Sequence, residues 1–203
     1  MIAVLAGLVL LSGCGNRKEN LFDGKSLDGW ICITADDTTA CDQPTFSARD
    51  GVLHISGQPF GYIRTAKAYG DYRLHLEWRW AGGERVDGGI FNRLQEGDRV
   101  WPLGIQCQMT EADMGVLMGG IPMEGAEGDG FYKKARLTPE SPEKPVGEWN
   151  VMDFVCQGGH LGITMNGVPL NQAECEATSG FIGFQSEGGA LDFKDIWLIP
   201  LKP

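Results

Sequence analysis

Ten residues near the middle of the chain constrain its fold more tightly than any other segment. From Asp71 to Trp80, polar and apolar side chains alternate without a break. Such a period of two is typical of a β-strand that has one face in a core and the other face outside it. The apolar face comprises Tyr72, Leu74, Leu76, Trp78 and Trp80, and the polar face comprises Arg73, His75, Glu77 and Arg79. We expect the polar face either to be solvated or to line a groove.

The rest of the chain is typical of an all-β protein. Further strands are expected at residues 52–56, 61–65, 88–93, 104–109, 149–157, 161–165, 181–186 and 191–199. Asn166-Gly167 predicts a type I′ hairpin turn, and residues 119–130 and 137–147 are expected as long loops. No window of a dozen residues keeps a helical period without Gly or Pro, and glycine supplies 30 of the 203 residues. This pattern favours a sandwich or jelly roll of antiparallel sheets.

The length and charge exclude several classes of protein. A chain of 203 residues can bury a substantial core as one domain. The net charge of −10 argues against a nucleic-acid partner, because nucleic-acid binding needs a clustered basic surface. The proportions of hydrophobic and charged residues, 42% and 22%, exclude a disordered chain.

The first residues have the features of a targeting segment. Residues 1–13 carry no charge and are mostly apolar, which predicts a signal peptide. The segment ends in Leu11-Ser12-Gly13-Cys14, which resembles the lipobox of bacterial lipoproteins. The resemblance implies a lipid on Cys14, a tether over residues 14–20, a folded domain over 21–203, and attachment to the membrane of the bacterial cell envelope, facing the periplasm or the outside. A chance cysteine in an ordinary signal peptide is the alternative.

The other five cysteines could pair if the domain lies outside the cytoplasm. Cys32 and Cys41 flank a short polar loop, and Cys156 and Cys175 bracket a predicted hairpin. Each pair could form a disulfide or stay unpaired. Cys107 would then be a buried thiol that packs like a small apolar residue. None of the spacings indicates a zinc site.

Several phrases, in order along the chain, resemble the bacterial 3-keto-disaccharide hydrolase domain family. They are LFDGKSLDGW (21–30), DGVLH (50–54), GYIRT (61–65), YRLHLEWRW (72–80), GEWN (147–150), MNGV (165–168), GFQSEG (183–188) and LDFKDI (191–196). The resemblance implies a concanavalin-A-like β-sandwich, a jelly roll of two antiparallel sheets. It also implies a carbohydrate substrate, specifically a glycoside whose sugar carries a ketone at C3. An envelope-anchored glycoside-cleaving enzyme is therefore our first hypothesis.

A ketone at C3 changes the chemistry of cleavage. It acidifies the proton on C2, and the leaving group on C1 lies β to the resulting enolate. Elimination followed by water addition would then break the glycosidic bond. This route needs a base, a group that stabilises the enolate oxygen and an acid for the leaving oxygen. An Arg, a His or a divalent cation could serve the enolate, and no other cofactor is expected. The paired acids of jelly-roll glucanases on one strand, as in Glu-x-Asp-x-Glu, are not found.

Two segments supply the catalytic candidates. His75, Glu77 and Arg79 share the polar face of one strand, where structural ion pairs are the alternative role. Gln106 stands where the family usually has Glu, so the resemblance implies that binding could persist without catalysis. A non-catalytic carbohydrate-binding lipoprotein is therefore the second hypothesis, and an envelope scaffold component the third. Ile105 and Cys107 are expected to face the core, opposite Gln106 and its neighbour Gln108.

The candidates for substrate binding come from four further phrases. They are Arg64, Asp87, Asn92, Arg93, Trp101, Gln108, Gln185 and Glu187. A salt bridge is the alternative for Arg64, and a core position beside Pro102 is the alternative for Trp101. If the site is correct, Arg64, Glu77, Gln106 and Gln185 converge.

Other polar residues are expected to be structural. His54 lies among apolar neighbours and is expected to be a satisfied structural histidine, with a catalytic role as the alternative. His160 follows a turn and is expected at the surface. The acidic run of Glu124, Glu127 and Asp129 could bind Ca²⁺, but it lacks EF-hand spacing and is expected to be a solvated loop.

Overall fold

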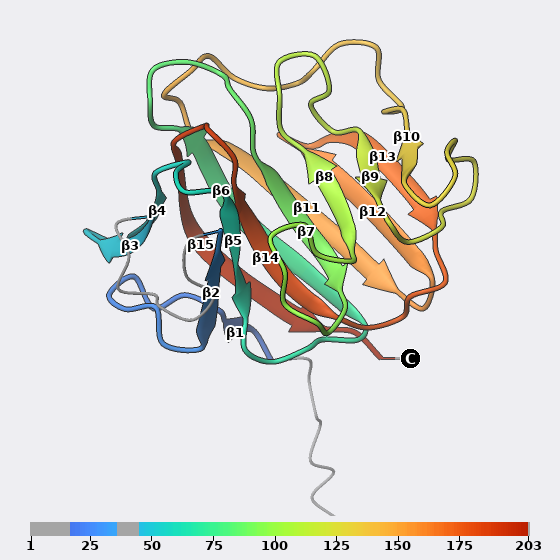
Figure 1. The fold of residues 1–203 in the computed structure, drawn as a ribbon, viewed down its shortest axis with the longest axis horizontal. Coiled ribbons are helices and arrows are strands. Elements are labelled where there is room, and N and C mark those ends of the chain that lie inside the picture. The colour runs from blue at the N-terminus through green and yellow to red at the C-terminus, as the bar shows by residue number, and fades with distance from the viewer. Residues whose placement is uncertain (1–16, 36–44, 203) are drawn as a thin grey trace, which may run out of the picture.

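The protein is a sandwich of two antiparallel sheets, seen in a computed structural model that describes residues 17–35 and 45–202 (Figure 1). Across these ranges there is no helix. The predicted signal peptide and Cys14 lie outside the described residues. None of the described segments forms a helix long and apolar enough to cross a membrane.

Sheet A contains eight strands. In spatial order they are β13 (Val168–Glu174), β12 (His160–Met165), β11 (Asn150–Gln157), β6 (Tyr72–Trp80), β15 (Leu191–Pro200), β4 (Val52–Ile55) and β3 (Phe46–Arg49), with β1 (Glu19–Asn20) also paired to β15. Sheet B contains seven strands. In spatial order they are β10 (Tyr132–Lys134), β9 (Leu117–Gly119), β8 (Ile105–Gln108), β7 (Gly89–Leu94), β14 (Phe181–Ser186), β5 (Gly61–Thr65) and β2 (Trp30–Thr34).

The alternating segment forms β6, a nine-residue strand in the middle of sheet A. Its five apolar side chains are at most 1% exposed and face sheet B across the core. Trp30, Phe184 and Phe193 pack together in the same core, with ring centroids 5.4 and 4.4 Å apart. Burial of such large aromatic surfaces is the main source of stability in a sandwich of this kind. The prediction that one face of the segment is a core face is confirmed.

The turn chemistry between β12 and β13 also agrees with the sequence. Asn166 and Gly167 have φ values of +51° and +81°, which a type I′ turn requires at both central positions. The loop expected at residues 137–147 contains no strand. The strands β2, β3, β9 and β10 were not predicted, because they are short and show no long alternation.

Within residues 17–35 and 45–202, the cysteines comprise three free thiols and one disulfide-bonded residue. Cys107 is a free, fully buried thiol, as predicted. Of the two possibilities left open for Cys156 and Cys175, the unpaired one is correct, because both are free thiols. Cys156 points into the core, whereas the sulfur of Cys175 lies against backbone carbonyl groups. Cys32 is disulfide-bonded, and Cys41 lies outside the described residues.

Candidate functional site

A pocket of about 450 Å³ opens on the outer face of sheet B. Its floor is formed by side chains of β7, β8, β9 and β14, and its walls by the segments beside them. The lining residues are Asp87, Phe91, Trp101, Pro102, Gly104, Gln106, Gln108, Thr110, Asp113, Met118, Gly119, Phe131, Lys133, Gln185 and Glu187. Six of the predicted binding and catalytic residues therefore come together in this pocket. They are Asp87, Trp101, Gln106, Gln108, Gln185 and Glu187.

Strand alternation explains why β8 contributes two glutamines to the pocket. Ile105 and Cys107 are fully buried in the core between the sheets. Gln106 and Gln108 point to the opposite face, as the sequence predicts. Successive residues of a strand face opposite sides of the sheet, so the two amides stand side by side in the pocket.

The floor of the pocket is a chain of hydrogen bonds that joins two carboxylates. Gln106 donates through Nε2 to Oε1 of Gln108 and, at 2.9 Å, to Oε1 of Gln185. The Nε2 group of Gln108 donates to Oδ1 of Asp87 at 2.8 Å. At the other end, Nε2 of Gln185 donates to Oε2 of Glu187. The three amides are nearly buried, so each of these bonds forms away from bulk water.

The carboxylates at the two ends of the chain are hard to ionise. Burial raises the pKa of Glu187 to about 7, the negative charge of Asp87 adds to the increase, and the hydrogen bond from Gln185 opposes it. Burial also raises the pKa of Asp87, against hydrogen bonds from the Gly88 backbone and Gln108. Near neutral pH, Glu187 can therefore either accept or release a proton.

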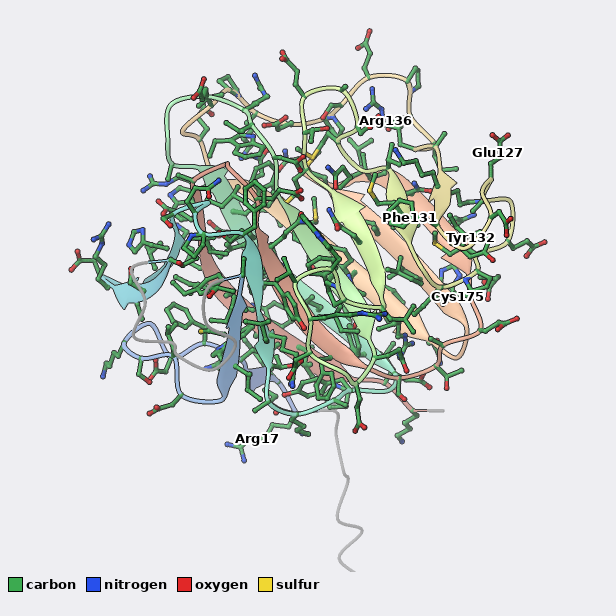
Figure 2. All side chains as sticks on the ribbon, viewed as in Figure 1. Arg17, Glu127, Phe131, Tyr132, Arg136 and Cys175 are labelled. Atoms are coloured by element: carbon green, nitrogen blue, oxygen red, sulfur yellow. The ribbon has the colours of Figure 1, made fainter. Side chains whose placement is uncertain are left out.

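Exposed aromatic rings flank the pocket. Trp101 is 55% exposed and Phe131 is 53% exposed. The ring of Phe60 lies 6.2 Å from that of Trp101. Figure 2 shows Phe131 next to Tyr132, whose ring instead packs against the core. Trp101 is thus not a core residue, and the alternative interpretation of it is wrong.

Sequence reasoning missed several lining residues, above all Phe131, Lys133 and Asp113. Lys133 lies on β10, which is a short strand at the edge of sheet B. Phe131 and Lys133 reach the pocket because β9 and β10 follow β8 in the sheet, and Asp113 lies in the connection between β8 and β9. Alternation of Phe131 with Lys133 was the only signal in the sequence, and three residues are too few to distinguish it from chance.

Arg64 lies on β5 of the same sheet but has another partner. Its Nε and Nη2 atoms donate to the two oxygens of Asp98 at 2.7 Å each. The same interaction lowers the pKa of Asp98. The hydroxyl of Tyr62 also donates to Asp98, at 3.2 Å. The salt-bridge alternative for Arg64 is therefore the one that the structure supports.

Asn92 and Arg93 are buried structural residues outside the pocket. Asn92 accepts a hydrogen bond of 2.8 Å from the hydroxyl of Tyr72 in the core. Arg93 has a φ of +56°, and its guanidinium donates to backbone carbonyls of three separate segments, at Gly70, Gly158 and Thr178. Asn92 faces the core by strand alternation, opposite Phe91, whereas Arg93 departs from the alternation at a point where the register of β7 and β14 is irregular.

His75, Glu77 and Arg79 lie on the outer face of sheet A, on the far side of the sandwich from the pocket. Each has an ion-pair partner within the sheet, namely Asp153 at 3.0 Å for His75, Lys194 at 3.2 Å for Glu77 and Asp192 at 2.8 Å for Arg79. The rings of His75 and Trp197 are also stacked. The expected convergence of Arg64, Glu77, Gln106 and Gln185 is therefore wrong, and only the two glutamines meet.

The remaining polar candidates have local partners. His54 contacts Asp192 at 2.6 Å, in agreement with a structural histidine, and His160 contacts Glu174 at 2.7 Å. The side chains of the acidic run at 124–129 are exposed. Within residues 17–35 and 45–202, no group of three or more His, Cys, Asp or Glu side chains is arranged to hold a metal ion.

Comparisons with known proteins agree with this architecture. A model of the 3-keto-alpha-glucoside-1,2-lyase-like domain, the 3-keto-disaccharide hydrolase domain, matches residues 17–199. A search of curated proteins finds none that matches the chain.

Solved structures show the same fold at low sequence identity. A proposed glycosyl hydrolase from Parabacteroides distasonis is 22% identical with a TM-score of 0.65, covering 91% of this chain and 94% of that one. A β-glucanase from Bacillus licheniformis is 11% identical with a TM-score of 0.62, covering 93% and 99%. A carbohydrate-binding module from Bacillus subtilis is 11% identical with a TM-score of 0.62, covering 84% and 95%. The fold is thus the jelly roll.

Proposed function

The chain belongs to the 3-keto-disaccharide hydrolase domain family, and we propose that it cleaves glycosides whose sugar carries a ketone at C3. The pocket on sheet B is the site of this reaction. The observation that carries the proposal is the carboxyl of Glu187, whose pKa of about 7 suits a base that works near neutral pH. Strongly perturbed carboxyls in a pocket are typical of catalytic sites.

The reaction proceeds by elimination and hydration. A base removes the proton from C2, and the electron pair passes to the ketone oxygen to give an enolate. The enolate re-forms the ketone, a C1=C2 double bond forms, the C1–O bond breaks, and the leaving oxygen takes a proton. Water then adds its hydroxyl to C1 and a proton to C2, so that the net reaction is hydrolysis.

Two groups of the pocket match the needs of this route. Glu187 is the base for the C2 proton, and once protonated it can pass that proton to the leaving oxygen. Lys133 is the cation that lines the pocket and stabilises the negative charge on the enolate oxygen. Asp87 lies at the other end of the amide chain, where it accepts the hydrogen bond of Gln108, and its negative charge helps to raise the pKa of Glu187.

The exposed aromatic side chains that flank the pocket bind the substrate. Trp101 and Phe131 expose more than half of their surface, whereas apolar rings are usually buried. The C–H faces of a sugar ring stack well against such rings, and the amides of the floor can exchange hydrogen bonds with its hydroxyls. The pocket therefore offers a polar floor and apolar walls to one sugar ring.

The test is the release of nitrophenol from the nitrophenyl glycoside of 3-keto-glucose, with and without added divalent cations. We expect release by the wild-type protein and a large loss with Glu187→Gln. Glu176→Gln is the matched control, because Glu176 is exposed away from the pocket. No release by the wild type under either condition would disprove the proposal, as would full activity of Glu187→Gln.

Gln106 favours a second candidate function, the binding of a carbohydrate without its cleavage. An amide stands at the centre of the pocket where the family resemblance places a carboxylate. An amide keeps the shape and the hydrogen-bonding capacity of the carboxylate but cannot act as a base. Binding of 3-keto-glucosides without turnover, measured by calorimetry, would support this function over the first.

We further propose that a lipid on Cys14 anchors the domain to the bacterial cell envelope. The lipobox-like Leu11-Ser12-Gly13-Cys14 supports this, as does the disulfide-bonded state of Cys32, since disulfides persist in oxidising compartments. Cys14→Ser should move the protein from the membrane fraction to the soluble fraction of the expressing bacterium. Membrane association that survives this change, or a Cys14 peptide without lipid in mass spectra, would contradict the anchor.

A further inference from the structure

The three glutamines of the pocket floor have a fixed hydrogen-bond direction that follows from their neighbours. In their ionised forms Asp87 and Glu187 only accept hydrogen bonds, so Gln108 turns its NH₂ group to Asp87 and Gln185 turns its NH₂ group to Glu187. Both amide oxygens then point toward Gln106. Gln106 must therefore supply two N–H donors from a single side chain.

Of glutamine, glutamate and methionine, which have similar shapes, only glutamine supplies the donors that the central position needs. A primary amide has two N–H donors, whereas an ionised glutamate has none and a methionine has none. A carboxylate at position 106 would face the amide oxygens of Gln108 and Gln185. Both amides would have to rotate to donate to it. Their carbonyl oxygens would then face the carboxylates of Asp87 and Glu187, and neither oxygen in such a contact can donate a hydrogen bond.

A second observation shows that the fold provides room for this side chain. Gly89 lies on β7, between β8 and β14, and pairs with Gln108. A Cβ atom at Gly89 would lie 2.5 Å from Nε2 of Gln106 and 2.7 Å from its Cδ and Cγ atoms. No left-handed φ requires glycine at this position. Position 89 is therefore small because the Gln106 side chain occupies the space above it.

We infer that Gln106 is a positioning residue that fixes the amide orientation of Gln108 and Gln185 and so holds Asp87 and Glu187 as the two acceptor ends of one chain. The catalytic consequence of this role rests on the proposed function, but the role itself does not. Gln106 is thus an integral part of the hydrogen-bonded floor.

The other charged groups of the pocket would respond to the same change. Asp87, Asp113 and Lys133 line the pocket with Glu187, and the Asp113 charge acts on Asp87 and the Asp87 charge on Glu187. When Gln106 no longer supplies its donors, the amide oxygens of Gln108 and Gln185 lose the partner that holds them in place, and the hydrogen bonds from these amides to the two carboxylates weaken together. Both must then become harder to ionise, because a hydrogen bond to the charged form favours it.

The test is a titration of the ¹³C-labelled carboxyl groups by NMR in the absence of substrate. The variants are Gln106→Glu, Gln106→Met and Gly89→Ala, of which the last displaces Gln106 without removing a polar group. We expect the pKa values of both Asp87 and Glu187 to rise by about one pH unit in each variant. The control is Gln172→Glu, the same change on exposed β13 of sheet A, which should leave both values unchanged.

The possible results separate this inference from the proposed function. A rise at both carboxyls supports the positioning role even if the wild-type protein cleaves no 3-keto-glycoside. Unchanged values in Gly89→Ala and Gln106→Met, in samples whose thermal unfolding shows a folded domain, would overturn it. A rise at Glu187 alone would also overturn it, because Gln106 would then serve only one end of the chain.

Discussion

Nε2 of Gln106 donates a hydrogen bond of 2.9 Å to Oε1 of Gln185, although a whole strand separates β8 from β14. Strands two places apart in a sheet are roughly 10 Å apart, so a contact between their side chains must cross the strand between them. Gly89 on β7 leaves the crossing point free of any side chain. The link between the acidic ends of the pocket therefore depends on a residue that contributes no functional group.

Glu187→Gln is expected to stabilise the fold at high pH. Burial raises the pKa of Glu187 to about 7, above its ordinary value of 4.5, so the folded state holds this proton more tightly than the unfolded state. The contribution of Glu187 to stability is therefore favourable at low pH and is lost as the pH rises through about 7. Because water screens this partly exposed group, we expect a gain of about 1 kcal/mol at pH 8 and none at pH 4. Urea unfolding at the two pH values measures it, and equal effects at both would contradict the raised pKa.

The rate of turnover should increase with pH, whereas the contribution of Glu187 to stability decreases with pH. If Glu187 is the base, kcat rises with pH as its carboxyl ionises and levels off above about pH 7. In Glu187→Gln this rise should disappear, with a loss of kcat of about 10² to 10⁴-fold. A pH–rate profile of nitrophenol release measures both. A profile that still rises through pH 7 in the variant would assign the base to another residue.

Trp101→Ala and Phe131→Ala should weaken substrate binding with little effect on the chemical step. Both rings are more than half exposed, so their loss costs the fold little. A stacked ring contributes about 1 kcal/mol to binding, and KM should rise about five- to tenfold in each variant while kcat stays near the wild-type value. Leu137→Ala is the control, since Leu137 is 54% exposed and lies away from the pocket. A fall in kcat at unchanged KM would show that the rings do not bind the sugar.

Arg93→Met should destabilise the fold and leave the pocket intact. The guanidinium of Arg93 is fully buried and donates to carbonyls of Gly70, Gly158 and Thr178, which join three connecting segments at one end of the sandwich. Removal of these donors leaves buried carbonyls without partners, at a cost of about 3 kcal/mol. Chemical denaturation measures the loss, and sugar binding by the folded fraction should be unchanged. A loss below about 1 kcal/mol would show that water replaces the guanidinium.

The sequence predicts the individual strands of this protein better than it predicts which strands lie side by side in a sheet. The alternation in β6 and the Asn166-Gly167 turn are local signals, and both are confirmed. The face of β8 that carries Gln106 and Gln108 follows from alternation alone. Which sheet a strand joins is not local information, and the grouping of Glu77 with Gln106 was wrong for that reason, since β6 and β8 belong to different sheets.

Residues that reach the site through sheet order left no signal in the sequence. Lys133 lies in the pocket because β10 pairs with β9 and β9 with β8, which the local sequence does not indicate. Arg93 was predicted to line the pocket but lies at the end of the core, where the register between β7 and β14 changes locally. A charged side chain in a family-like phrase predicts importance, but only its neighbours decide between structural and catalytic roles.

Gln106→Glu should lower activity, although the resemblance to the family would suggest a gain. The new carboxylate would face the amide oxygens of Gln108 and Gln185, which accept hydrogen bonds and cannot donate them. The amides would rotate, Glu187 would lose its donor and hold its proton more tightly, and less of it would be ionised at pH 7. A rise of about one pH unit leaves about a tenth of the base ionised, so kcat at pH 7 should fall several-fold and recover almost fully at pH 9. Gln172→Glu, with the same change of charge, should keep the wild-type rate at both pH values. A higher kcat in Gln106→Glu would contradict the positioning role and support a wild-type protein that binds carbohydrate without cleaving it.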